Sequence, residues 1–142
     1  MRDAGRGFWI VAGGLAVGCV LLVVQILANR PIAETIAHAQ HTLRTAQAAA
    51  EDSRSKTGSF LGADAGGLEV TRPSLTFHEA GSPSVGLDDV SIAASDRVWA
   101  AAVRARPGAC FYLRLEVGAD ALYGVGQECT GRAALAASDT RW

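Results

Sequence analysis

The feature that most constrains this chain is an uncharged apolar run at residues 8–28, 21 residues reading FWIVAGGLAVGCVLLVVQILA. An α-helix rises about 1.5 Å per residue, so this run would extend about 31 Å, which matches a hydrocarbon core of about 30 Å. Its only polar side chain is Gln25. The run therefore predicts a transmembrane helix at residues 8–28, preceded by a short leader at residues 1–7.

A cleaved secretory signal is the alternative for this run. Signal peptides have apolar regions of about 7–15 residues, shorter than this one, although the run ends in a tolerable small-residue cleavage site. Arg2 and Arg6 precede the run, offset only by Asp3, whereas Arg30 beyond it is followed by Glu34. The positive-inside rule then predicts a cell-membrane protein with one span, a cytoplasmic N-terminus and an extracytoplasmic C-terminal domain.

Small residues recur within the run at the spacing used for close helix packing. Gly14 and Gly18 form a GxxxG pair, and Ala12 and Ala16 form a second pair of small residues. Such pairs let two helices approach closely in a bilayer, so we expect partner helices here. The alternative is that glycine and alanine are simply common in membrane spans.

Charge and composition exclude one class of partner. The chain has 142 residues with 13 basic and 14 acidic side chains, a net charge of -1. Non-specific nucleic-acid binding needs a clear positive excess, so we expect no nucleic-acid partner. The length allows one small domain besides the apolar segment.

An amphipathic helix is predicted to continue from the membrane over residues 29–56. It contains no glycine, is rich in alanine, and carries Pro31 where a new helical turn would begin. Its apolar residues fall on one narrow stripe, which must pack on a partner layer. The stripe consists of Ile32, Ile36, Ala39, Leu43, Ala46 and Ala50.

A small β domain is predicted over residues 57–132. It begins with a glycine-rich connection in which Phe60 and Leu61 are the expected anchors onto the core. Extended segments are then expected at residues 68–70, 75–78, 90–94, 98–105, 110–117 and 122–125. The fold class is therefore α+β: a long N-terminal helix, part transmembrane and part exterior, packed on an antiparallel sheet of three or four strands.

Alternation along these segments assigns side chains to sheet faces. Trp99, Ala101, Val103 and Ala105 share one face, as do Phe111, Leu113, Leu115 and Val117 on the next long segment. We expect Trp99 to pack in the core against Ala39, Leu43 and Ala46. The alternative is an exposed ligand-binding strip of Trp99, Phe111 and Tyr112.

Two cysteines lie in the predicted exterior domain. Cys110 and Cys129 have eighteen residues between them. Outside the cytoplasm a disulfide is the expected state, and closing such a loop contributes on the order of 3 kcal/mol. Two buried free thiols are the alternative. The remaining residues, 133–142, are expected to be a mobile tail.

Together these parts resemble the type IV pilin and pseudopilin group. The resemblance rests on the basic leader ending in Gly7, the apolar helix from Phe8, the loop at residues 57–60 and a small sheet closed by a C-terminal cysteine pair. The part at residues 99–131 looks most like pilin-type proteins of actinobacteria. In that group a peptidase cuts between a glycine and a phenylalanine-like residue, which implies processing between Gly7 and Phe8.

The chain departs from the group at one position with a direct consequence. The fifth residue from Phe8 is Ala12, where major subunits usually carry a glutamate that pairs with a neighbour's amino terminus. The resemblance therefore implies a minor subunit of a pilus or a type II-like secretion apparatus. The competing hypothesis is a permanently anchored extracytoplasmic binding module with the same fold and no filament.

Candidate chemistry is sparse. Glu34, His38 and His41 have helical spacing for one face, which suits either metal ligands or ordinary polar surface residues. Calcium is the one candidate ion for the loop carboxylates, whose alternative role is turn formation; they are Asp64, Asp88, Asp89, Asp96 and Asp120. We expect no bound cofactor.

The sequence offers little support for a hydrolase triad or for nucleotide binding. His78 with Ser74 or Ser95 and an aspartate has the residue types of a triad, but neither a nucleophile elbow nor an oxyanion loop accompanies it. The sequence contains no phosphate-binding loop. We therefore expect a structural protein rather than an enzyme.

Overall fold

The computed structural model describes the backbone of residues 4–106 and 108–142, and the side chains of residues 31–106 and 108–142. Helix α1 (Ala4–Thr57) runs through two compact units that divide between Glu34 and Thr35. All other helices and strands of the described chain belong to the unit that begins at Thr35.

The predicted membrane segment falls outside the residues whose side chains are described. This applies to the span at residues 8–28, to the processing residues Gly7 and Phe8, and to the helix-packing residues Ala12, Gly14, Ala16 and Gly18. Among the residues that are described, no helix is both long enough and apolar enough to cross a bilayer.

Helix α1 ends at Thr57, and a glycine follows it directly. Gly58 has a φ of 78°, in the left-handed region that glycine adopts without steric cost, and its N–H donates to the Arg54 carbonyl at 2.7 Å. One turn earlier, Lys56 and Asp52 pair at 2.7 Å. The helix predicted at residues 29–56 is thus confirmed over residues 31–56.

A five-stranded mixed sheet forms the other main layer, with strand order β1-β2-β3-β4-β5. The sequence predicts an antiparallel sheet of three or four strands, but the sheet has five, and β1 runs parallel to β2 while the other three pairs are antiparallel. The strands are β1 (Thr76–Glu79), β2 (Asp89–Ala94), β3 (Val98–Arg104), β4 (Cys110–Glu116) and β5 (Leu122–Gly126). The parallel pair arises because a long connection, residues 80–88, returns the chain before β2 begins.

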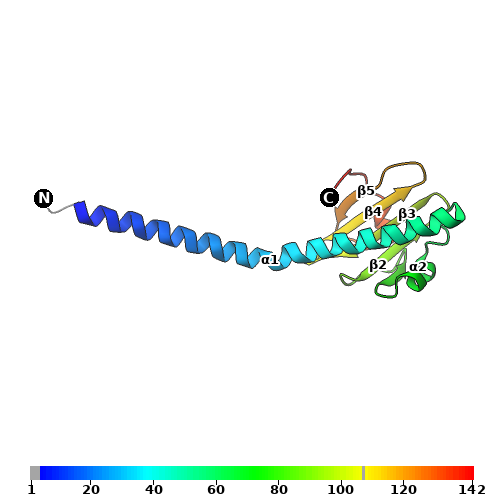
Figure 1. Ribbon diagram of the computed structural model, residues 1–142, viewed down its shortest axis with the longest axis horizontal. Helices are drawn as coiled ribbons and strands as arrows, with labels where there is room; N and C mark the ends of the chain where they lie inside the picture. Colours follow the sequence, from blue (N-terminus) through cyan, green and yellow to red (C-terminus); the bar gives the residue numbers. More distant parts are fainter. Residues whose placement is uncertain (1–3, 107) are drawn as a thin grey trace. The chain divides into compact units, whose positions relative to one another are not determined.

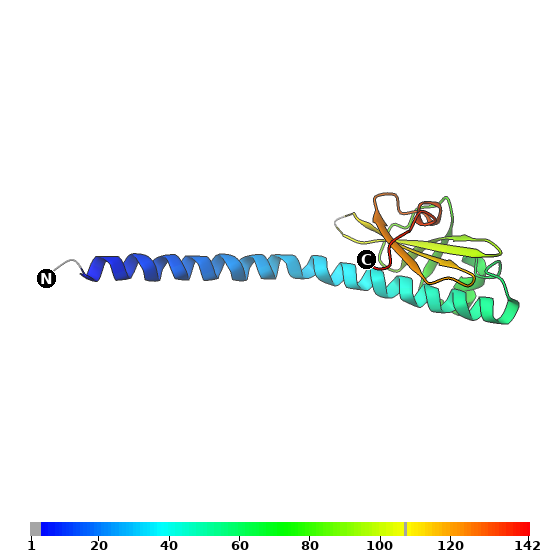
Figure 2. The same ribbon diagram turned by 90° about the horizontal axis from the view of Figure 1, so that it is seen from above.

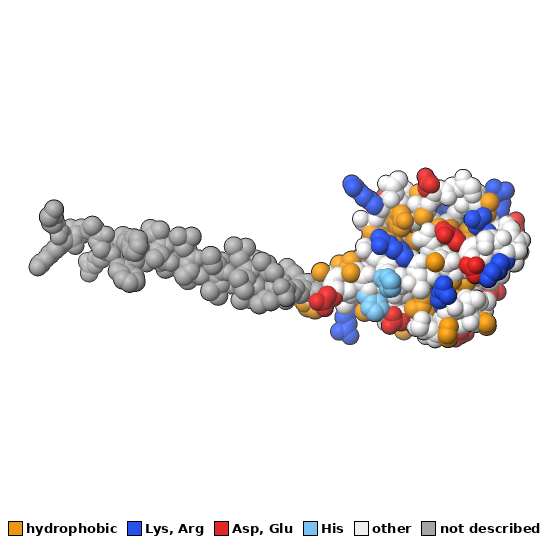
Figure 3. Space-filling view, viewed as in Figure 1, with side chains coloured by type: hydrophobic (Ala, Val, Ile, Leu, Met, Phe, Trp, Pro, Cys, Tyr) orange, Lys and Arg blue, Asp and Glu red, His pale blue; other side chains and the backbone are white. Residues whose placement is uncertain are grey.

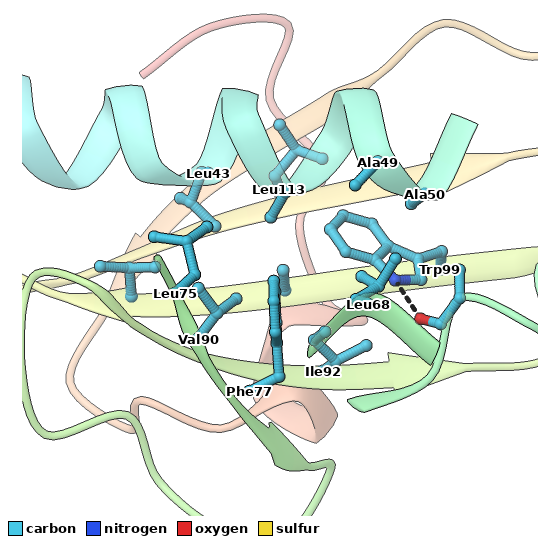
Figure 4. Packing of buried hydrophobic residues seen from close by; sticks show 14 of the residues in the cluster. Leu43, Ala49, Ala50, Leu68, Leu75, Phe77, Val90, Ile92, Trp99 and Leu113 are labelled. Atoms are coloured by element: carbon cyan, nitrogen blue, oxygen red, sulfur yellow. Dashed lines mark hydrogen bonds between the residues drawn. The ribbon is translucent and has the colours of Figure 1, made fainter. Parts of the chain in front are cut away.

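The main core lies between α1 and one sheet face (Figures 1 and 2). Figure 4 shows Leu43, Ala49 and Ala50 facing the strands, with Trp99 below the helix. Ala39, Leu43, Ala46 and Ala50 of the predicted stripe are all fully buried, whereas Ile32 is 40% exposed. The alanine side chains are small, which brings the sheet close to the helix. The α+β class and the helix-on-sheet packing are confirmed.

The opposite sheet face is covered by α3 (Gly131–Ala134) and the residues after it. The approach is close at Gly131, where an added Cβ would lie 2.4 Å from the Ile92 carbonyl carbon. The Gly131 N–H donates to the buried Ser91 hydroxyl at 2.8 Å. A second, smaller core therefore lies beneath the sheet, formed by Ala100, Ala102, Cys110, Tyr112, Cys129, Ala134 and Ala137.

Residues 68–70 were expected to be extended but form part of helix α2 (Ala65–Thr71). The Asp64 side chain caps this helix by accepting the Gly67 N–H at 2.8 Å. Leu68 is buried and Val70 is 84% exposed, so the apparent strand pattern is one turn of an amphipathic helix. Phe60 anchors the connection as expected, whereas Leu61 is 61% exposed.

The tail, residues 133–142, also differs from the expected mobile segment. Ala134 and Ala137 are buried, and Asp139 forms an antiparallel bridge with Tyr123. The final residue, Trp142, donates its indole N–H to the Tyr112 carbonyl at 2.9 Å. Buried alanines on one side and Trp142 on the other thus hold the polar residues 138–141 in place.

Candidate functional site

The cysteine pair forms the expected disulfide. Cys110 begins β4 and Cys129 precedes α3, with Cα atoms 5.1 Å apart. Both residues are buried in the smaller core. The bond therefore ties the central sheet to the segment that covers its second face.

The histidines of α1 do not assemble with Glu34. His38 instead reaches across to the connection before β2, where its Nε2 lies 2.7 Å from an Asp88 carboxylate oxygen. His41 and Ser74 line a shallow pocket with this pair. In Figure 3, histidine side chains lie near acidic side chains on this face. No group of three metal-ligating side chains forms among the described residues.

The loop carboxylates are mostly engaged with their own chain. Asp89 contacts His78 through one carboxylate oxygen and accepts the Val85 N–H at 3.0 Å with the other. Asp64 caps α2. Asp96 contributes its carbonyl, not its carboxylate, to the Phe60 N–H. The turn-forming role is therefore the one the geometry gives to Asp64 and Asp89.

The histidine and serines of the candidate triad make other contacts. His78 is paired with Asp89, while the Ser95 hydroxyl donates to the Val98 carbonyl in the β2–β3 turn at 2.9 Å. Ser74 lies near His38 and His41, but no hydrogen bond joins it to an imidazole in the described chain. A serine nucleophile is normally activated through such a hydrogen bond.

The three aromatic residues of the alternative ligand-binding strip, Trp99, Phe111 and Tyr112, are buried. Trp99 is fully buried and donates its indole N–H to the Ala63 carbonyl at 3.0 Å, the dashed line in Figure 4. Tyr112 lies on the opposite face and donates its hydroxyl to the Glu128 carbonyl at 2.7 Å. Burial raises the pKa of the Tyr112 hydroxyl above 10.0, with a further contribution from the Glu128 charge. The core prediction for Trp99 is confirmed.

A corner formed by Trp142 was not predicted. Its ring packs against Tyr123 at 4.5 Å between centroids and against Phe111 at 6.3 Å. The Arg44 guanidinium of α1 lies 5.7 Å from the same ring. Trp142 therefore links the helix, β4 and β5, and only its apolar side chain at the end of a polar segment signalled this role.

A second unpredicted feature is a cleft at the end of the unit where α1 enters it. The Thr35 hydroxyl donates to the Arg106 carbonyl at 3.3 Å, across the β3–β4 turn. The cleft has a volume of about 580 Å³ and is lined by Thr35, Val85, Arg104 and Arg106, among others. The turn itself was predicted from Arg106-Pro107-Gly108, but its position beside Thr35 depends on the helix-on-sheet packing.

Comparison with known protein families, curated proteins and solved structures finds no match for this chain. Its functional interpretation therefore depends on the residues and their geometry.

Proposed function

We propose that the chain is a single-pass membrane subunit of pilin-like architecture that assembles with other membrane or pilin-like subunits through its N-terminal helix. A pilus or a type II-like secretion apparatus is the expected assembly, with this chain as a minor subunit. The proposal includes no enzymatic activity, bound cofactor or nucleic-acid partner.

The observation that carries this proposal is how the apolar surface of α1 is divided along the chain. Over residues 39–50 the alanine-rich face of the helix is covered by the sheet. Residues 8–28, by contrast, have an apolar sequence on every side of a helix, with no charged residue. A helix that is apolar all round requires a bilayer or other helices as its surroundings.

The disulfide supports an extracytoplasmic location for the folded unit. Disulfides persist in oxidising compartments and are rare in the cytosol. Cys110 and Cys129 are buried and bonded. Together with the basic residues before the apolar run, this supports a cytoplasmic N-terminus and an exported sheet domain.

The alternative function is a permanently anchored extracytoplasmic binding module. Ala12 favours it, because the glutamate typical of major pilin subunits is missing from this sequence. The two functions share the anchor, the fold and the disulfide. They differ in whether the leader is removed.

The decisive measurement is the intact mass and N-terminal residue of the protein from native membranes, with and without reductant. A chain beginning at Phe8 would support the pilin-like subunit, and a chain retaining residues 1–7 would support the anchored module. A chain beginning after Ala28 would show a cleaved signal and overturn both. Reduction should add the mass of two hydrogens if the disulfide is formed.

A matched pair of variants tests the processing site itself. Gly7→Val places a branched side chain directly before the expected cut and should block it. Gly5→Val makes the same change two residues earlier in the leader and should leave processing intact. Equal processing of both variants would contradict a cut after Gly7.

A further inference from the structure

The end of the folded unit nearest its first residue carries two arginines. Arg104 ends β3, and Arg106 lies in the turn that follows, where its carbonyl accepts the Thr35 hydroxyl. Arg106 is exposed and Arg104 is partly exposed. Neither guanidinium takes part in an ion pair with any described residue.

The backbone around Arg104 is held firmly. Its backbone N–H donates to the Ser84 hydroxyl oxygen at 2.9 Å, and its Nε donates to the Ser84 carbonyl at 3.1 Å. Asp89, at the start of β2, already accepts the Val85 N–H and contacts His78. The positive charge at this end is therefore positioned but not neutralised.

Exposed apolar side chains flank the arginines. Val85 is 73% exposed and lines the cleft that contains Arg104 and Arg106. Val125 is 56% exposed and lines a neighbouring cleft that also includes Arg104. Arginines beside exposed apolar residues are typical of surfaces that lie at a membrane interface.

Chain connectivity limits how far this surface can be from the predicted span. Thr35 follows the end of the apolar run, Ala28, by seven residues. Seven residues reach at most about 25 Å when extended and about 10 Å when helical. The polar headgroup layer adds about 5–8 Å to each side of the hydrocarbon core. Arg104 and Arg106 are therefore within reach of lipid phosphates.

We propose that this end of the folded unit binds the bilayer surface, with Arg104 and Arg106 contacting phospholipid phosphates and Val85 lying among the headgroups. Guanidinium groups suit this role because their planar donors match phosphate oxygens. This inference rests on the proposed membrane anchor. The contact would hold the sheet domain against the membrane before or between assembly events.

The test uses the full chain, in which Cys19→Ala removes the free cysteine outside the disulfide and one new cysteine carries a fluorophore. The chain is inserted into vesicles of phosphatidylcholine and phosphatidylglycerol that also contain a lipid with a nitroxide on its headgroup. Val85→Cys reports on the proposed surface. Asp96→Cys reports on the β2–β3 turn, at the other end of β3. We expect strong nitroxide quenching at position 85 and weak quenching at position 96.

Substitution of the arginines tests whether they bind lipid phosphates or only lie near the bilayer. Each arginine near an anionic surface contributes about fivefold to the binding equilibrium, so Arg104→Gln with Arg106→Gln should lower that equilibrium about 25-fold. Arg97→Gln removes an exposed arginine at the far end of β3 and should change nothing. Arg106→Gln alone leaves the Ser84 contacts of Arg104 intact and should give the smaller loss.

The outcomes distinguish this inference from the proposed function. If the chain fails to co-float with vesicles, the membrane anchor itself is contradicted. If the chain co-floats but quenching at position 85 equals that at position 96, or survives the double substitution, only the headgroup contact is overturned. Equal effects of Arg97→Gln and Arg106→Gln would also overturn it.

Discussion

Trp99 joins three parts of the folded unit through one side chain. It is fully buried beneath α1, belongs to β3, and binds the Ala63 carbonyl in the connection between α1 and α2. Removing its ring would leave a cavity and an unpaired buried carbonyl. Both effects destabilise a small domain.

We predict that Trp99→Ala lowers the free energy of unfolding of this unit by about 3–5 kcal/mol. Trp99→Phe should cost less, because it retains most of the apolar volume and loses only the indole donor. Urea unfolding of the full chain in detergent, followed by circular dichroism, measures both. Val70→Ala is the control, since Val70 is 84% exposed. A loss below about 1 kcal/mol for Trp99→Ala would contradict the packing role.

Tyr112 makes stability depend on pH in the alkaline range. Its folded-state pKa is raised above 10.0 by burial first and by Glu128 second. The folded state therefore retains the Tyr112 proton at a pH where the unfolded chain has lost it. Stability from this group is complete below pH 10 and falls as pH rises above it.

We predict that Tyr112→Phe reduces this alkaline loss of stability, although it removes the hydroxyl bond to Glu128. The difference in absorbance at 295 nm between wild type and variant should titrate with a midpoint above 10.0. Unfolding at neutral pH should show the variant to be weaker by about 1 kcal/mol. A difference titration centred below pH 10 would refute the assigned direction.

Alternation along strands was enough to predict which residues face α1. Trp99, Ala101 and Val103 share the main core, while Ala100 and Ala102 lie in the smaller one, as the period of two requires. The same rule failed for residues 68–70, because two apolar residues on either side of Glu69 do not distinguish a strand from a helical turn. The capping aspartate, Asp64, was the local signal for the helix.

At the scale of elements, the C-terminal segment stabilises the edge of the sheet. Without it, β5 would have an unpaired edge, but the Tyr123 N–H donates to Asp139 at 2.8 Å and the Asp139 N–H returns the bond at 3.0 Å. Trp142 then covers the ring of Tyr123. Edge strands are often protected in this way.

We predict that Trp142→Ala loosens this corner and lowers stability by about 1–2 kcal/mol, the contribution of its ring contacts and partial burial. Hydrogen exchange of a peptide spanning β5 should become faster, with the largest change at Tyr123. Arg141→Ala changes the exposed neighbouring residue and serves as the control. Unchanged exchange in β5 would show that the tail is held by its backbone bridge alone.

The parallel β1–β2 pair and the ordered tail share one reason for having escaped prediction. Both depend on contacts between distant parts of the chain: β1 pairs with β2 after a long connection, and Trp142 meets Tyr112, Phe111 and Arg44. Local pattern identifies segments and faces, whereas tertiary packing decides their partners. The cleft beside Thr35 also escaped prediction because it depends on such packing: the β3–β4 turn lies beside Thr35 only in the folded unit.

On the scale of the whole molecule, the proposed function requires α1 to serve two environments. Its second half packs on the sheet, and under the proposed function its apolar first half must find lipid or other helices. With 3.6 residues per turn, Gly14 and Gly18 fall on one side of a helix and Ala12 and Ala16 on nearly the opposite side. Glycine lets a neighbouring backbone approach more closely than alanine does.

We therefore predict that Gly14→Leu with Gly18→Leu weakens helix association about tenfold, or about 1.4 kcal/mol. Leucine preserves apolarity, so insertion should be unaffected. Energy transfer between labelled copies in vesicles measures self-association, and crosslinking in native membranes detects adducts with other subunits. Ala12→Leu with Ala16→Leu is the matched control and should cost less. If the control pair is the more disruptive, the packing face is the alanine side; if neither pair has an effect, small-residue packing does not drive assembly.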